Sequence, residues 1–229
     1  VRDTAADVEG HLDEFVVKRP RPAEAVAEAL ARAEKPVVLA DVADNVGGGS
    51  PGDGTALLAE LVRQKARGAV VIIADAAAVA TARRAGSGNE ITITVGGRSD
   101  ALHGAPVELA VEVAWLSDGT YRAEGSWMTG QTFSMGPTAV LETEDGIIVV
   151  VTSRAVPPFH VEQLTSNGID PRRASIIVAK GAIAWRAAYE AVMASAIEVD
   201  TPGCTPVDPW SLKRTTKPLA VAAHIATRR

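Results

Sequence analysis

Three short runs of apolar residues constrain the fold of this chain more than any other feature. They occupy residues 37–40, 69–74 and 176–179 and consist of Val, Ile, Leu and Ala without an intervening polar residue. A strand that is covered by helices on both faces of its sheet has this continuous pattern. Because helical spacing of apolar residues follows each run, the sequence predicts an α/β fold with a buried, mainly parallel sheet and flanking helices.

The composition supports this fold class, and a second pattern of apolar residues indicates an additional β-rich part. Hydrophobic residues make up 47% of the 229 residues but aromatic residues only 4%, as in parallel sheets covered by Ala-rich helices. Apolar residues alternate with threonine from Ile91 to Val95, and residues 107–115 and 147–152 are also strand-like. We therefore expect a mainly antiparallel β-rich insert over about residues 90–152, with hairpin turns at 117–119 and 144–146.

Helices are predicted where apolar residues recur at helical spacing. They lie at residues 3–16, 23–33, 55–67, 75–84, 159–168 and 182–196. Thr55 and Asp75 stand where helix N-caps are expected. Prolines after Thr201 predict an irregular tail that Trp210 and Leu212 anchor.

The domain organisation follows from this order of elements. Residues 1–35 are predicted to be a helical lead-in, either a linker or the end of a preceding domain, and residues 36–229 an α/β domain. The first residue is Val1 rather than Met, so we expect a fragment of a longer protein.

Charge and hydropathy exclude some classes of partner. The formal net charge is -5 and the basic residues are scattered, which disfavours a nucleic-acid partner. No apolar run approaches the roughly 20 residues that cross a bilayer, so a membrane partner is not expected either. The lone Cys204 excludes an intrachain disulfide and a cysteine-based zinc cluster, and it fits a reducing, cytoplasmic location.

The four histidines are His11, His103, His160 and His224, and none has a short metal-binding spacing. Each is predicted to be structural or exposed, with His160 the best candidate for a ligand. The residues also show no nucleophile paired with a base. The catalytic residues therefore stay unknown, and no metal site is predicted within this chain.

The segment between the first buried strand and the next helix is the main candidate site. We call residues 41–55 the glycine loop, because Gly47, Gly48 and Gly49 lie at its centre. It follows the carboxyl end of a strand, where open α/β sheets place their sites. Its backbone N–H groups suit an anion, whereas its acidic side chains suit a hard cation. The polar side chains concerned are Asp41, Asp44, Asn45, Ser50, Asp53 and Thr55.

The glycine loop also matches two motifs formally. Gly47, Gly49 and Gly52 satisfy the dinucleotide pattern Gly-x-Gly-x-x-Gly, but the aspartates would repel a pyrophosphate. Residues 48–52 fit the nucleophile elbow Gly-x-Ser-x-Gly, but Pro51 lacks the N–H that the oxyanion hole requires. A third interpretation is a plain connector whose aspartates cap helices.

Two basic residues belong to the same predicted edge of the sheet. Lys180 ends the third apolar run, and Arg186 lies about one turn into the next helix. They suit anion recognition beside the glycine loop, or equally surface ion pairs.

Several separated segments resemble the carboxyl-terminal domain of the MlrC-like proteins, the family of the microcystin-degrading metallopeptidase. They are residues 41–55, 135–140, 168–171, 178–180, 185–189 and 199–203. The resemblance implies an additional amino-terminal domain whose His and acidic residues hold zinc in the full-length protein. It also implies hydrolysis of an amide bond in a small peptide or amide substrate. No cofactor is expected in this fragment, which should be inactive by itself.

The resemblance further implies that this domain lines an interdomain substrate cleft with its amino-terminal partner domain. The residues carried over as this binding wall are Asp41, Asp44, Asn45, Gly47, Gly48, Gly49, Asp53, Thr55, Lys180 and Arg186. One departure is Ala184, where many relatives have histidine. The rival hypothesis is therefore a non-catalytic small-molecule or protein-binding module that has lost the family chemistry.

Overall fold

The computed structural model describes residues 2–11 and 17–207. The chain divides into two compact units, one of residues 1–19 with 208–229 and the other of Pro20–Val207. In the first unit, α1 (Arg2–Gly10) overlaps the helix predicted at 3–16 and begins one residue earlier, and residues 12–16 are outside the described part. The predicted anchors Trp210 and Leu212 also lie outside the described residues.

The second unit is built on a mixed eight-stranded sheet with strand order β10-β1-β9-β2-β8-β7-β4-β3. The five strands from β10 to β8 run parallel, whereas β8, β7, β4 and β3 pair antiparallel. The predicted α/β class, with a mainly parallel sheet and an antiparallel part, is confirmed. The strands are β1 (Val37–Asp41), β2 (Ala69–Ala74), β3 (Glu90–Val95), β4 (Val107–Ser117), β7 (Thr138–Thr143), β8 (Ile148–Thr152), β9 (Ile176–Ala179) and β10 (Ser195–Val199).

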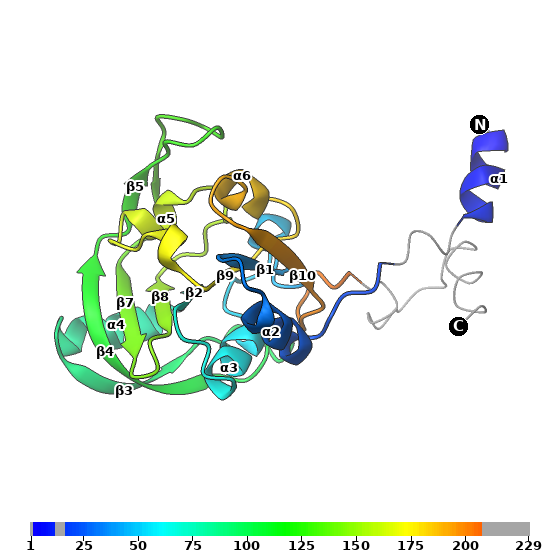
Figure 1. The fold of residues 1–229 in the computed structure, drawn as a ribbon. Coiled ribbons are helices and arrows are strands. Elements are labelled where there is room, and N and C mark those ends of the chain that lie inside the picture. The colour runs from blue at the N-terminus through cyan, green and yellow to red at the C-terminus, as the bar shows by residue number, and fades with distance from the viewer. Residues whose placement is uncertain (1, 12–16, 208–229) are drawn as a thin grey trace. The chain divides into compact units, whose positions relative to one another are not determined.

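Helices cover both faces of this sheet (Figure 1). On one face lie α2 (Pro22–Ala31), α3 (Ala56–Arg63) and α4 (Ala76–Ala85), and on the other α5 (Glu162–Thr165) and α6 (Trp185–Tyr189). Leu39 packs into the core on the α3 side, and its neighbour Val38 into the core on the α6 side. Burial on both faces explains why the apolar runs of the sequence are continuous.

One predicted helix is wrong over most of its length. The helix expected at 182–196 is only α6, and the chain then forms β10, which pairs in parallel with β1. Ile197 and Val199 of β10 point into the core at the two-residue spacing of a strand. The Ala-rich residues before β10 extended the predicted helical pattern to residue 196, so this short alternation was not recognised as a strand.

One of the two predicted hairpin turns is confirmed and the other is wrong. Residues 144–146 join β7 and β8, which are antiparallel neighbours, so that hairpin is confirmed. The hairpin expected at 117–119 is wrong, because β4 pairs with β7 instead of with the strand that follows it. That strand, β5 (Thr120–Arg122), pairs with β6 (Thr132–Ser134) in a separate two-stranded sheet.

Of the two predicted helix caps, one makes a capping hydrogen bond and the other does not. The side chain of Asp75 accepts a hydrogen bond from the N–H of Ala78 at 2.9 Å, so Asp75 caps α4 as expected. Thr55 precedes α3 but its side chain makes no capping hydrogen bond. The helix predicted at 159–168 is reduced to the four residues of α5.

Gly146 provides a test of the confirmed hairpin. Its φ of 75° is left-handed, and a Cβ there would approach Cγ of Arg67 to 3.3 Å. Gly146→Ala is expected to lower the free energy of unfolding by about 1 kcal/mol, measured by urea denaturation. Gly125→Ala is the control, since nothing lies within 4 Å of a Cβ there. Equal stability of the two variants would contradict the turn assignment.

Candidate functional site

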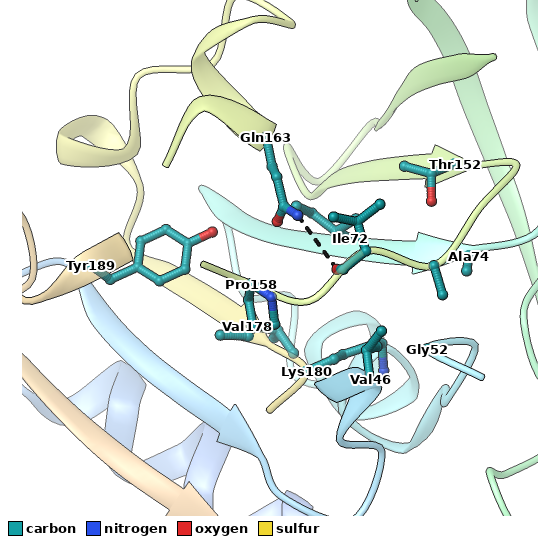
Figure 2. Close-up of a pocket in the computed structure, with 13 residues that line it drawn as sticks. Val46, Gly52, Ile72, Ala74, Thr152, Pro158, Gln163, Val178, Lys180 and Tyr189 are labelled. Carbon is teal, nitrogen blue, oxygen red and sulfur yellow. Dashed lines mark hydrogen bonds between the residues drawn. The ribbon is translucent and has the colours of Figure 1, made fainter. Parts of the chain in front are cut away.

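The glycine loop leaves the carboxyl end of β1, and Lys180 directly follows the neighbouring strand β9. Parallel pairing of these two strands therefore places Asp41 and Lys180 at the same edge of the sheet. The structure thus brings Lys180 to the glycine loop, as the sequence predicted. Figure 2 shows the Lys180 side chain beside Val46 and Gly52 of the loop.

Lys180 lies in a buried ion cluster with two aspartates of the loop. Its Nζ is 2.9 Å from Oδ2 of Asp41 and 3.0 Å from Oδ2 of Asp44, and it donates to the carbonyl of Gly54 at 2.7 Å. All three side chains are at most 6% exposed. Burial acts to lower the pKa of Lys180, but the two carboxylates outweigh it and raise this pKa above its usual value. The ammonium therefore holds its charge in the interior.

Asp44 occupies the centre of the loop. Its Oδ1 accepts from the N–H of Gly52 at 2.8 Å and its Oδ2 from the N–H of Gly54 at 2.7 Å. Burial acts to raise the pKa of Asp44, but Lys180 and these N–H groups hold it below its usual value. A Cβ at Gly54 would lie 2.7 Å from Oδ2 of Asp44, so this close approach requires glycine.

Asp41 is fixed from the far end of the described chain. The hydroxyl of Thr201 donates to Oδ1 of Asp41 at 2.5 Å, and the N–H of Asp44 lies 3.3 Å from the same atom. The hydroxyl of Thr205 donates to the carbonyl of Ala43 at 2.8 Å. The segment after β10 therefore braces the glycine loop.

The loop between β3 and β4 also makes hydrogen bonds that hold the glycine loop in place. Oδ2 of Asp53 accepts from the N–H groups of Arg98 and Ser99, each at 2.8 Å. The hydroxyl of Thr55 donates to the carbonyl of Ala105 at 2.7 Å, which explains why it does not cap α3. The other carboxylate oxygen of Asp53, Oδ1, is buried and has no hydrogen-bond partner among the described residues.

His103 is the main member of the site that the sequence did not reveal. It is fully buried, and its Nδ1 lies 2.8 Å from Oδ1 of Asp100. Its Nε2 accepts from the N–H of Cys204 at 3.3 Å, which assigns the proton to Nδ1. Nε2 also lies 3.7 Å from Oδ1 of Asp44. Because His103 is far from the glycine loop in sequence, no spacing pattern indicated this contact.

The three central glycines are the exposed part of the loop. Gly47 and Gly48 belong to the 3-10 turn η2 (Val46–Gly48), and Gly49 follows it. The N–H of Gly48 donates to the carbonyl of Asn45 at 2.8 Å. The N–H of Gly49 donates to the carbonyl of Val46 at 3.1 Å. These N–H groups bond within the loop, and those of Gly52 and Gly54 bond to Asp44. The arrangement argues against a phosphate cradle, because the carboxylate of Asp44 already occupies the anion position.

Two further candidates lie apart from the ion cluster. Arg186 is exposed, stacks on the ring of Trp185 at 4.4 Å and pairs with Glu198 at 3.3 Å. Ser50 is buried, and its hydroxyl lies 3.0 Å from Sγ of Cys204 and 3.3 Å from Oγ1 of Thr205. Neither contact supplies the base that a serine nucleophile requires.

A small pocket opens beside the loop at the carboxyl ends of β2, β8 and β9 (Figure 2). Its accessible volume is about 20 Å³, enough for about one water molecule or a group of similar size. Figure 2 shows Tyr189 of α6 with its hydroxyl pointing into this space. The sequence placed Tyr189 within a helix but did not indicate a pocket.

Within residues 2–11 and 17–207, no three His, Cys, Asp or Glu side chains lie close enough to hold a metal ion. No helix in this described part is long and apolar enough to cross a membrane.

Comparison with known proteins now adds to this geometry. Residues 39–215 match the family described as MlrC C-terminus. Microcystinase C from a Sphingomonas species is 25% identical over 155 residues, which cover 67% of this chain but 30% of that protein. The crystal structure of a "Putative metallopeptidase" from Mesorhizobium sp. BNC1 superposes with a TM-score of 0.83 at 26% identity, covering 96% of this chain and 44% of that one. The chain thus spans less than half the length of either relative, and it belongs to the MlrC C-terminal family.

Proposed function

We propose that this chain is the carboxyl-terminal domain of a zinc-dependent hydrolase that cleaves an amide bond in a small peptide or amide. In this proposal it lines the substrate cleft, opposite an amino-terminal domain that holds the metal. The observation that carries the proposal is the coverage: nearly the whole chain superposes on the Mesorhizobium protein, yet accounts for only 44% of it. The catalytic groups then belong to the remaining part.

The donor chemistry of this chain agrees with a metal held elsewhere. Zinc needs three or four His, Cys, Asp or Glu ligands around one point. The buried aspartates Asp41 and Asp44 both pair with Lys180, and Asp44 also accepts two backbone N–H groups. These carboxylates do not fit a zinc site, because the ammonium of Lys180 lies where a cation would bind.

The residues of the proposed cleft wall then have two roles. Gly47, Gly48 and Gly49 are exposed and present backbone to a substrate without side-chain hindrance. Buried side chains hold that backbone in place, and they belong to Asp41, Asp44, Asp53, Thr55 and Lys180. The half-buried Asn45 begins the turn of the glycines. Arg186, on the exposed surface of α6, contributes charge at the rim.

The test is hydrolysis by the full-length protein on a panel of small amides and dipeptides. Turnover is expected to disappear with a chelator and to return with added zinc. The 229-residue chain should show no turnover and no stoichiometric tight zinc. Chelator-insensitive turnover by the full-length protein would exclude the metal mechanism.

A non-catalytic binding module is the second candidate, and Ala184 favours it. This residue is half-buried at the start of α6, beside the proposed wall, and has no group for acid–base or ligand chemistry. If this candidate is correct, the full-length protein binds amides without hydrolysing any of the panel. Turnover of any member of the panel excludes it.

A further inference from the structure

The pocket beside the glycine loop is lined by a buried tyrosine whose hydroxyl has no protein partner among the described residues. Tyr189 is 1% exposed, and no hydrogen bond joins its hydroxyl to another residue in the described part of the chain. Buried tyrosine hydroxyls are nearly always hydrogen-bonded. A hydroxyl that points into a pocket, as this one does in Figure 2, therefore indicates a polar group supplied from outside the chain.

The other polar side chains of the pocket already donate to the protein. Thr152 donates to the carbonyl of Arg154 at 2.9 Å, and Gln163 to the carbonyl of Pro157 at 3.0 Å. Three acceptors surround the ammonium of Lys180, one for each of its three protons, so it has no donor left for a ligand. The pocket thus presents a single available side-chain donor.

The electrostatics of this pocket favour a neutral ligand that accepts a hydrogen bond. Burial raises the pKa of Tyr189, and Tyr121 and Glu162 raise it further, so the hydroxyl stays protonated and donates. Glu162 is buried and its Oε2 has no partner in the described part of the chain. Its negative charge near Tyr189 disfavours an anionic ligand.

Size and lining restrict the ligand further. Apart from the polar groups, the wall is aliphatic and includes Val46, Ile72, Val178 and the exposed Ala155. A Cβ at Gly52 would come within 2.9 Å of Cγ2 of Val46, so a larger residue at this position would crowd the pocket lining. The space admits a carbonyl oxygen, which is about the size of a water molecule, and excludes a bulky side chain.

We propose that this pocket binds the carbonyl oxygen of a small, uncharged amide through the hydroxyl of Tyr189. The proposal rests on the proposed function, because the ligand has the chemistry of the proposed substrate. It makes the pocket a substrate subsite that selects a small neutral group, next to the exposed glycines of the loop.

The first test separates a ligand-directed hydroxyl from a structural one. Tyr189→Phe keeps the buried ring and removes only the unpartnered hydroxyl, so its thermal midpoint should equal or exceed that of the wild type. Tyr121→Phe is the matched control, since its hydroxyl lies 3.2 Å from Nδ1 of His160. Its midpoint should fall by about 2–4 °C. A fall of that size for Tyr189→Phe would overturn the proposal.

The second test measures binding directly with N-methylacetamide as the probe. Backbone amide resonances of Val46, Gly52 and Ala155 should shift and saturate as the probe is added to the 229-residue chain. Tyr189→Phe should weaken this binding by about fivefold, the effect of one lost hydrogen bond. Acetate should leave these resonances unchanged.

Absence of shifts at these residues, which is the result expected if the pocket holds only water, would overturn the proposal. Equal affinity of Tyr189→Phe and wild type would also overturn it. The outcome is separable from the proposed function, because no turnover is measured. Binding by the chain without hydrolysis by the full-length protein would leave the subsite standing and reject the enzyme.

Discussion

Lys180→Met is expected to lower the free energy of unfolding by about 3–5 kcal/mol. Methionine has a similar length, so the substitution removes the charge and the three contacts of Nζ while largely filling the space. Asp41 and Asp44 then remain buried, at 2% and 0% exposure, without their cation. A buried charge that loses its partner has no water to replace it, which is the cause of the large effect. Urea denaturation at pH 7 measures it.

The same variant should show a characteristic dependence on pH. The pKa of Asp44 is lowered in the folded protein, so its stabilisation is present above the unfolded pKa of about 3.9 and lost as pH falls through the folded value. Lys180 has a raised pKa, so its contribution is complete below the unfolded pKa of about 10.4 and is lost as pH rises through the higher folded value. In Lys180→Met the pKa of Asp44 rises, and its protonation relieves the buried charge. The difference from wild type should therefore narrow below about pH 5.

Arg186→Met is the matched control for this charge removal. Arg186 is 47% exposed and its contact with Glu198 is open to solvent, so the loss should be about 1 kcal/mol or less. If Lys180→Met costs no more than Arg186→Met, the cluster does not stabilise the fold, and the carboxylates are free for a ligand.

Much of the sheet was predictable because burial on both faces leaves a strong pattern in the sequence. The runs that became β1, β2 and β9 contain almost only aliphatic residues, and in each case the structure buries most of them. The alternation from Ile91 to Val95 predicted β3 for a different reason, since only one of its faces is covered. By contrast, β10 is an edge strand with only two residues in the main core, Ile197 and Val199, and so its pattern was too short to detect.

The candidate site was predictable only in part. The position of the glycine loop and of Lys180 follows from parallel strands ending at one edge. Sequence could not indicate that Lys180 pairs with Asp41 and Asp44, because the choice between a free and a paired charge depends on burial. It also could not indicate His103 or Thr201, which reach the loop through tertiary folding from distant segments.

These contacts change the interpretation of the acidic residues. Their number in the sequence favoured a site for a hard cation, yet Asp44 accepts from Gly52 and Gly54, and Asp53 from Arg98 and Ser99. The protein thus uses its own carboxylates to order a loop that is too rich in glycine to be rigid by itself. Exposed backbone on a fixed support is the property that a cleft wall needs.

Asp44→Ala should reveal this support most directly, with an expected loss of about 3–5 kcal/mol of unfolding free energy. It leaves the N–H groups of Gly52 and Gly54 without acceptors and leaves Lys180 with Asp41 as the one carboxylate of the cluster. Asp170→Ala is the control, since that exposed aspartate also accepts a backbone N–H, from Arg172 at 3.0 Å, and should cost only about 1 kcal/mol. Amide hydrogen exchange should in addition become faster throughout the loop in Asp44→Ala. A variant that keeps wild-type stability and exchange but loses amide hydrolysis in the full-length protein would show instead that Asp44 acts on the substrate or the metal.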